Sequence, residues 1–136
     1  MSKALKLHIK GGRLIDPANG IDRLADIFVA DGLIVGAGDT PLANFNPTSV
    51  LDASGCIVCP GLVDLCARLR EPGFEYKATL QSEMAAAVAG GVTRLSCPPD
   101  TDPPLDEPGL VQMLTHRARL PGFAHVHPVE IGRAHV

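Results

Sequence analysis

The residues most able to do chemistry stand at the end of an apolar run, residues 61–69, where Cys66, Arg68 and Arg70 alternate with apolar side chains. On a β-strand, residues i and i+2 point to the same face. A cysteine thiolate there could bind zinc. A guanidinium could not, because it stays protonated and has no free lone pair. The alternation therefore predicts that one possible metal ligand, Cys66, and two fixed cations, Arg68 and Arg70, lie on the same face.

A second pair with the same spacing is His125 and His127. Two imidazoles at i and i+2 could hold a metal, but we interpret them as residues that line the mouth of the fold or a loop. Cys56 and Cys59 stand three residues apart, so on a strand they face opposite sides and would chelate poorly. We expect them to be buried structural thiols.

These side chains must be positioned by the elements around them. In the first half, alternating or apolar segments predict short strands over residues 5–9, 13–15, 26–30, 33–36, 49–52 and 56–59. Gly11 and Gly12 are expected to separate the first two strands, and Asp31-Gly32 is typical of a hairpin turn. Short strands with tight turns fit a small antiparallel sheet or half of a sandwich.

The second half has a different period. Apolar runs predict buried strands over residues 61–69, 92–97 and 123–129, and helical spacing predicts a helix over 75–89. A second helix is expected to begin after Asp106 as its N-cap. Repeated βα units imply parallel strands with right-handed crossovers. Glu71 and Glu75 flank the turn after the first of these strands, and we expect both at the surface.

Composition excludes several classes of function. The 136 residues contain 12 Lys and Arg against 15 Asp and Glu, a net charge of −3, so no basic excess favours nucleic acid. A hydrophobic content of 46% argues against disorder. No apolar stretch approaches the roughly 18 residues of a membrane helix. The first residues contain no secretory signal pattern, so we expect a cytoplasmic protein with reduced cysteines.

Residues 51–73, LDASGCIVCPGLVDLCARLREPG, resemble the start of the barrel in the amidohydrolase superfamily. There, a small sandwich strand leads into a Pro-Gly-Leu/Ile-Val/Ile-Asp motif and then into His-x-His. Residues 70–75 (REPGFE) and 97–103 (CPPDTDP) narrow the resemblance to the dihydroorotase branch, whose second barrel strand is followed by an MPNTNP loop. The resemblance implies a TIM-type (β/α)8 barrel with an N-terminal β-sandwich portion. It is truncated here after about three strands, because eight need about 250 residues.

We divide the chain into the sandwich portion, 1–56, the first β/α units of the barrel, 57–129, and a tail, 130–136. The tail, EIGRAHV, resembles the translation of a sequencing adapter, and we interpret it as non-native.

The chain departs from the dihydroorotase pattern at the metal site. Cys66-Ala67-Arg68 stands where the family has His-x-His, so the resemblance implies no metal here, although active relatives use zinc. Arg70 matches the arginine that binds the substrate carboxylate. Asp100 replaces an asparagine that helps to hold substrate, and it would repel an anionic one. We expect Asp100 to pair instead with Arg68 or Arg70.

This combination resembles the inactive dihydroorotase-like chains that accompany aspartate transcarbamoylase in some bacteria. It implies a pseudoenzyme of pyrimidine biosynthesis, oligomeric as a full-length protein, that acts as an assembly partner of the aspartate transcarbamoylase catalytic chain. One alternative is an active, metal-dependent cyclic amidohydrolase in which Cys66 is recruited as a ligand. Another is a non-catalytic barrel that senses anions through Arg70.

Overall fold

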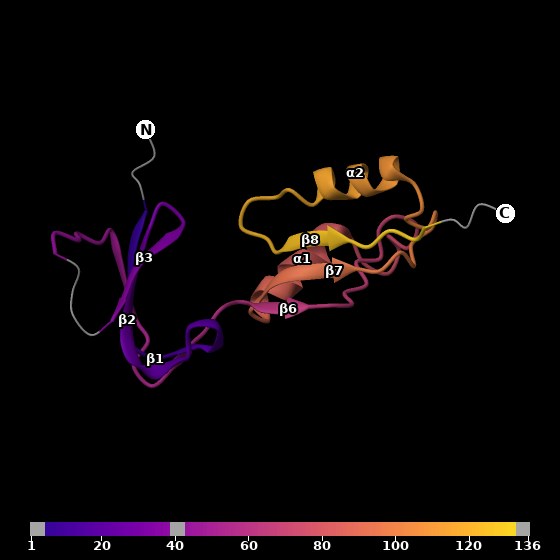
Figure 1. Ribbon diagram of the computed structural model, residues 1–136. Coiled ribbons are helices and arrows are strands. Elements are labelled where there is room, and N and C mark those ends of the chain that lie inside the picture. Colours follow the sequence, from indigo (N-terminus) through magenta and orange to yellow (C-terminus); the bar gives the residue numbers. More distant parts are fainter. Residues whose placement is uncertain (1–4, 39–42, 133–136) are drawn as a thin grey trace. The chain divides into compact units, whose positions relative to one another are not determined.

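The computed structural model describes residues 5–38 and 43–132 of the chain. The chain divides into two compact units, Met1–Pro60 and Gly61–Val136. In Figure 1 the first unit is coloured from indigo to magenta and the second from magenta through orange to yellow. The sequence placed this division after residue 56. Ile57–Val58 pairs with a strand of the first unit, so the division falls after Pro60 instead.

The first unit is built on a five-stranded sheet. Its elements are β1 (Lys6–Asp16), the 3-10 helix η1 (Pro17–Asn19), β2 (Ile21–Ala30), β3 (Leu33–Gly38), β4 (Ser49–Asp52) and β5 (Ile57–Val58). The strand order is β3-β2-β1-β4, and β5 also pairs with β1. β2 runs antiparallel to β1 and β3, whereas β4 and β5 run parallel to β1. The prediction of an antiparallel sheet is therefore confirmed for β1, β2 and β3. It was wrong for β4 and β5, which lie on the far side of β1 and run parallel to it.

β1 continues through Gly11 and Gly12, where the sequence predicted a break. The pairing with β2 shifts register between Ile9 and Gly12, as in a β-bulge. Gly11 has a φ of 73°, a left-handed conformation that glycine adopts without steric cost. A Cβ on Gly12 would lie 2.6 Å from Cγ2 of Val58. The two glycines thus bend the strand and admit β5, rather than ending β1.

The predicted hairpin between β2 and β3 is confirmed. Asp31 and Gly32 have φ angles of 53° and 78°, and two positive values are what a type I′ turn requires. One face of the sheet carries the core of this unit, in which Leu14, Ala25 and Ile27 are buried.

The second unit alternates strands and helices, as the sequence predicted. Its elements are β6 (Leu62–Asp64), α1 (Leu80–Ala89), β7 (Val92–Cys97), α2 (Pro108–Arg117) and β8 (His125–Pro128). The strands form one parallel sheet in the order β6-β7-β8, which Figure 1 shows with α1 and α2 beside it.

The core of the second unit lies on one face of this sheet. Leu95 of β7 and Val126 of β8 are buried in a cluster with Met84 of α1 and Leu114 of α2. Both helices therefore pack on the same face. The side chains that alternate with this buried set, such as Arg94, lie on the opposite face and are exposed.

Several boundaries in this unit differ from those predicted. β6 is only Leu62–Asp64 and its side chains are exposed, because it is an edge strand that no described residue covers. α1 begins at Leu80 rather than at residue 75. The N-cap of α2 is Glu107, with Pro108 in the first turn, and not Asp106. β8 is shorter than the expected 123–129.

The expected tail, 130–136, falls partly outside the described residues, which end at 132. Within them, the backbone N–H of Ile131 donates a hydrogen bond to the carbonyl of Leu105 at 3.0 Å. Among the described residues, no helix has both the length and the apolar character needed to cross a membrane.

A polar contact in the first unit stabilises the β-bulge. Asp26 of β2 accepts a hydrogen bond from the backbone N–H of Gly11 at 2.9 Å, and a second from Nε2 of His8 at 2.8 Å. The His8 ring stacks on Phe28, with centroids 4.6 Å apart. The hydrogen bond from Gly11, and then that from His8, lower the pKa of the Asp26 carboxyl against the opposing effect of burial.

We therefore expect Asp26→Asn to destabilise the first unit by about 1 kcal/mol at neutral pH, since it weakens charge-assisted hydrogen bonds. Because the folded-state pKa of Asp26 is lowered, its contribution is complete above the unfolded pKa. It is lost as the pH falls through the folded value. Urea unfolding at neutral and acidic pH measures the difference between the two proteins, with Asp31→Asn as an exposed control. A difference that persisted or grew in acid would contradict this account.

Candidate functional site

The segment after β6 leaves the strand conformation, so Cys66, Arg68 and Arg70 do not share a strand face as predicted. β6 ends at Asp64, whose Oδ1 accepts a hydrogen bond from the backbone N–H of Cys66 at 2.9 Å. This is an Asx-type turn, in which the side chain caps the backbone two residues on.

Two backbone contacts then fix the path of this segment. The N–H of Ala67 donates to the carbonyl of Ser96 in β7 at 2.9 Å, and the carbonyl of Arg70 accepts from the N–H of Phe74 at 2.8 Å. Arg70 has a φ of 66°, which is uncommon for a residue with a Cβ. The segment is thus held against the carboxyl end of β7 and turns sharply at Arg70.

Arg68 and Asp100 join this segment to the loop that follows β7. Nε of Arg68 lies 2.6 Å from Oδ2 of Asp100. Of the two pairings expected for Asp100, the structure forms the one with Arg68. The two side chains are 58% and 45% exposed, and such pairs contribute about 0–1 kcal/mol. The pair therefore contributes little to stability, but it fixes where both charges lie.

Arg70 has no side-chain partner among the described residues. Its guanidinium is partly exposed and retains its donors for an external group. Arg70 therefore follows the Arg68–Asp100 pair closely in the chain but differs from Arg68 in its contacts. The charge of Arg68 is neutralised by Asp100, whereas the Arg70 guanidinium can still donate hydrogen bonds to another group.

The two loops at this edge are packed closely together. The backbone N–H of Asp102 donates to the carbonyl of Pro72 at 3.1 Å. Gly73 has a φ of 98°, and a Cβ on it would lie 2.3 Å from the carbonyl oxygen of Asp102. Only glycine fits there. Within the second loop, the Thr101 hydroxyl donates to the carbonyl of Pro103 at 2.9 Å.

Cys66 and Cys97 have different environments. Cys97 is fully buried in the helix-covered core, whereas Cys66 is exposed. Burial is the main cause that raises the pKa of the Cys97 thiol, and the charges of Asp100 and Cys66 act in the same direction. A hydrogen bond from the backbone of Leu69 opposes them. Cys97 is therefore held as a thiol.

The residues at the two metal positions that the resemblance indicates differ in what they could offer a zinc ion. Cys66 could supply a thiolate, but Arg68 has no lone pair to donate and its charge would repel a cation. Within the described residues, no three His, Cys, Asp or Glu side chains are grouped as metal ligands would be.

The other predicted candidates lie elsewhere. His125 and His127 are exposed on β8, on the face of the sheet opposite the helices. Cys56 and Cys59, expected to be buried, are both exposed, and so is Ile57 of the short β5 between them. Their prediction as buried thiols was wrong.

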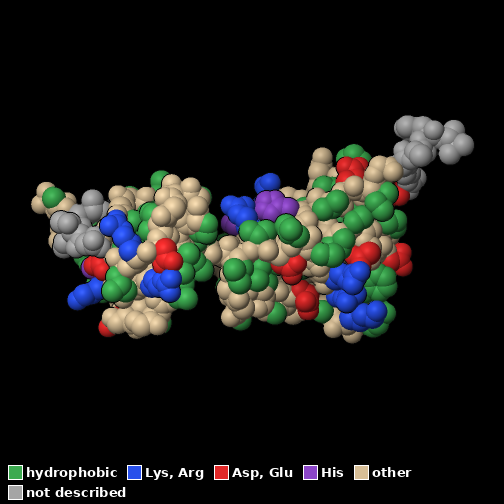
Figure 2. Space-filling view, turned by 60° about the horizontal axis from the view of Figure 1, so that its bottom comes forward, with side chains coloured by type: hydrophobic (Ala, Val, Ile, Leu, Met, Phe, Trp, Pro, Cys, Tyr) green, Lys and Arg blue, Asp and Glu red, His purple; other side chains and the backbone are tan. Residues whose placement is uncertain are grey.

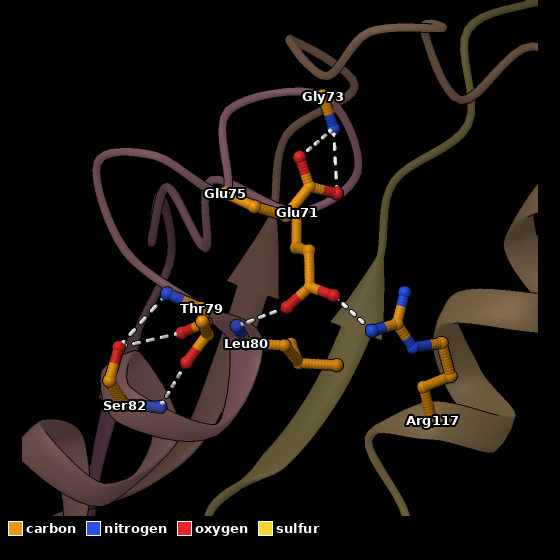
Figure 3. Close-up of polar contacts among 7 residues, drawn as sticks. All are labelled: Glu71, Gly73, Glu75, Thr79, Leu80, Ser82 and Arg117. Carbon is orange, nitrogen blue, oxygen red and sulfur yellow. Dashed lines mark hydrogen bonds and ion pairs between the residues drawn. The ribbon is translucent and has the colours of Figure 1, made fainter.

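Sequence reasoning missed Glu71, which is only 5% exposed. Figure 3 shows its carboxylate between the start of α1 and the end of α2. Oε2 accepts from the backbone N–H of Leu80 at 2.6 Å, and Oε1 pairs with Nη2 of Arg117. A negative charge at a helix N-terminus and a positive one in a last turn both favour the helix dipole. The prediction of a surface Glu71 was therefore wrong.

The start of α1 is fixed by further contacts beside Glu71. Thr79 and Ser82 form a reciprocal capping box, visible in Figure 3. Glu75, which is exposed as expected, accepts from the backbone N–H of Gly73 at 3.0 Å. Hydrogen bonds from its own backbone N–H and from Gly73 lower the pKa of the Glu75 carboxyl.

Comparison with known proteins agrees with this architecture. Residues 55–131 match the family described as dihydro-orotase-like. A dihydroorotase-like protein from Pseudomonas aeruginosa is 44% identical over 125 residues, and a dihydroorotase from Syntrophotalea carbinolica is 42% identical over 126. Each alignment covers 92% of this chain and 29% of the relative. The chain thus spans less than a third of the length of these curated relatives.

Solved structures give the same fold. The L-hydantoinase (dihydropyrimidinase) from Arthrobacter aurescens superposes with a TM-score of 0.66 and 28% identity, over 82% of this chain and 24% of that one. An N-acyl-D-glutamate deacylase from Bordetella bronchiseptica, solved with zinc and a phosphonate inhibitor, gives 0.52 and 29%, over 70% and 19%. The predicted fold class, an amidohydrolase-type α/β barrel of which this chain forms the first part, is confirmed.

We expect Glu71→Ala to destabilise the second unit by about 2–3 kcal/mol, because it leaves a buried N–H and the Arg117 charge without their acceptor. Chemical denaturation measures the loss, and hydrogen exchange at the Leu80 amide localises it. Glu75→Ala is the matched control, since that carboxylate is exposed, and it should cost much less. Equal losses in the two variants would show that Glu71 does not connect the helices.

We also expect the four thiols to fall into two classes with an aromatic disulfide reagent. Cys56, Cys59 and Cys66 are exposed and should react in the native protein, whereas Cys97 should react only on unfolding. Peptide mapping by mass spectrometry after short labelling identifies each site. Native-state labelling of Cys97 at the rate of Cys66 would contradict the buried position of β7.

Proposed function

Because the chain belongs to the dihydroorotase-like family, we propose that it is part of a catalytically inactive, dihydroorotase-like protein of pyrimidine biosynthesis. In this proposal the complete protein is cytoplasmic and oligomeric. It acts as an assembly partner of the aspartate transcarbamoylase catalytic chain, and its barrel serves as a scaffold rather than a hydrolase.

The observation that carries the proposal is the Arg68–Asp100 ion pair, 2.6 Å long. Arg68 stands where the resemblance expects the second histidine of His-x-His, and Asp100 where it expects a substrate-binding asparagine. The residues at these two positions of the family pattern therefore pair with each other. A carboxylate accepts hydrogen bonds but does not donate them, so Asp100 cannot replace the amide of an asparagine toward a substrate oxygen.

The chemistry of hydrolysis supports the same conclusion. Hydrolysis of a cyclic amide by this family depends on a water activated by a metal ion. Of the two positions at which the resemblance expects the histidines of His-x-His, only Cys66 can donate a lone pair to a metal, and Arg68 is a fixed cation. A hydrolytic reaction would need Cys66 to act with ligands from the remainder of the complete protein, which is the first alternative.

Arg70 favours a second alternative, a barrel that binds anions without turnover. Its guanidinium is free of side-chain partners within the described residues, and a free arginine is well suited to a carboxylate because it can form two parallel hydrogen bonds. This alternative shares the absence of hydrolysis with the main proposal and differs from it in requiring a ligand.

The test is turnover of dihydroorotate by the complete protein, with added zinc and with or without the aspartate transcarbamoylase catalytic chain. We expect no turnover in either case, together with stable co-purification of the two chains. An active dihydroorotase assayed in parallel is the positive control. Zinc-dependent turnover would refute the pseudoenzyme proposal, and failure to co-purify would refute the assembly role.

A further measurement separates the sensor alternative. Binding of carbamoyl aspartate to the complete protein, followed by calorimetry, should be undetectable if the barrel is only a scaffold. Binding without turnover that Arg70→Ala abolishes, and that the control Arg13→Ala leaves unchanged, would favour the sensor instead.

A further inference from the structure

We propose that Arg94 forms an ion pair inside the complete barrel with a carboxylate contributed by one of the strands that follow residue 132. The pair lies in the interior of the fold, apart from the edge that carries Arg68 and Asp100. It does not depend on the proposed function, because the barrel has to close whether or not it hydrolyses a substrate.

The strand register places Arg94 on the sheet face opposite the helices. Arg94 of β7 pairs with His125 of β8, and Ser96 pairs with His127. Residues paired across neighbouring strands point to the same face. Leu95, between Arg94 and Ser96, is buried under the helices, so the four polar side chains share the other face. Figure 2 shows purple histidine next to blue Lys or Arg side chains on one part of the second unit.

In the complete protein this face is the inside of the barrel. The helices of a (β/α)8 barrel form its outer ring, and the strand face opposite them points inward. The chain covers 29% of the curated relatives described above, so the remaining strands come from the part of the protein outside it. The interior of such a barrel is filled by layers of side chains and is not an open pore. Arg94 therefore packs against side chains of those remaining strands.

The three strands of the second sheet supply Arg94 with no carboxylate. On β6 its register partner is Val63, which is apolar. The next residue, Asp64, already accepts a hydrogen bond from the backbone N–H of Cys66 at 2.9 Å. On β8 the register partner of Arg94 is His125. Within the part of the chain that the structure describes, none of the ion pairs includes Arg94.

The described contact of the Arg94 guanidinium leaves its charge unbalanced. Nη1 of Arg94 lies 3.3 Å from Nε2 of His127. Because a guanidinium only donates, Nε2 is the acceptor and the ring proton is assigned to Nδ1, which makes this imidazole neutral. It satisfies one N–H group but not the positive charge. An arginine also cannot neutralise itself by losing its proton, so the charge has to be met by another group.

A carboxylate is the group that meets this charge best. A charge taken out of water is strongly unfavourable unless it is paired and hydrogen-bonded. The two oxygens of a carboxylate balance the charge and accept two parallel hydrogen bonds from a guanidinium. Charge complementarity therefore points to an Asp or Glu at an inward-facing position of a later strand. Water or a free anion would accept the same hydrogen bonds, and the test separates them from a carboxylate of the protein.

The test is thermal unfolding of the complete protein carrying Arg94→Met, which keeps an unbranched side chain but removes the charge. The substitution would leave a buried carboxylate unpaired, so we expect the unfolding midpoint to fall by about 5 °C or more. Arg94→Lys, which keeps the charge, should lose less. Arg13→Met is the matched control, because the Arg13–Asp22 pair is exposed and its loss should change the midpoint little.

A second set of variants identifies the partner. Each Asp and Glu that alternates inward on the later strands of the complete protein is replaced by its amide in the Arg94→Met background. Replacement of the partner should restore the midpoint, because it removes the buried charge that was left unpaired, whereas replacement at other positions should not. The same rescue is expected if Arg94→Met alone does not fold.

An unchanged or raised midpoint for Arg94→Met would overturn the proposal, because water would then meet the guanidinium. So would a loss that no acidic replacement restores. The measurements are made in phosphate buffer and in phosphate-free buffer of equal ionic strength. A loss that appears only in phosphate would assign the guanidinium to a free anion and would overturn the proposal as well.

Discussion

The Glu71 carboxylate connects the parts of the second unit that the sheet alone does not hold. A buried charge is unfavourable unless it is paired and hydrogen-bonded, so the fold must bring both the first N–H of α1 and Arg117 of α2 to it. These contacts fix the ends of two helices that pack on the same sheet face. They also fix the backbone of Glu71, the residue after Arg70, and so constrain the position from which the Arg70 side chain extends.

The sequence was sufficient where local pattern decides the structure. The spacing of Leu80, Met84 and Val88 predicted one buried face of α1, on which Leu80 and Met84 are buried but Val88 is 42% exposed. In α2, Leu114 is buried as its spacing predicted, as is the C-cap residue Ala118, and Asp31-Gly32 correctly predicted the hairpin. The sequence failed where distant partners decide. The two donors to the Glu71 carboxylate, Leu80 and Arg117, lie 9 and 46 residues further along the chain. No local periodicity reveals such pairs. Whether the side chains of β6 are buried likewise depends on what packs against the strand, and an apolar run does not specify that.

The candidate site was predictable in part for a geometric reason. Parallel neighbouring strands send their following segments to the same edge of the sheet, so opposite charges in the two segments, Arg68 and Asp100, could be expected to meet. The choice of Arg68 over Arg70 was not predictable. It depends on the Asx-type turn at Asp64 and on the left-handed backbone of Arg70, and both end the strand geometry that would have aligned the two arginines.

The spatial order of the strands in the second sheet, β6-β7-β8, is also their order along the chain. As a ribosome releases this unit, each new strand therefore finds its neighbour already synthesised, and no strand has to insert between two that are paired. The first sheet differs, because the far side of β1 stays without its partners until β4 and β5 emerge. The second sheet can thus grow in step with synthesis, whereas the first is completed only when most of its unit has left the exit tunnel.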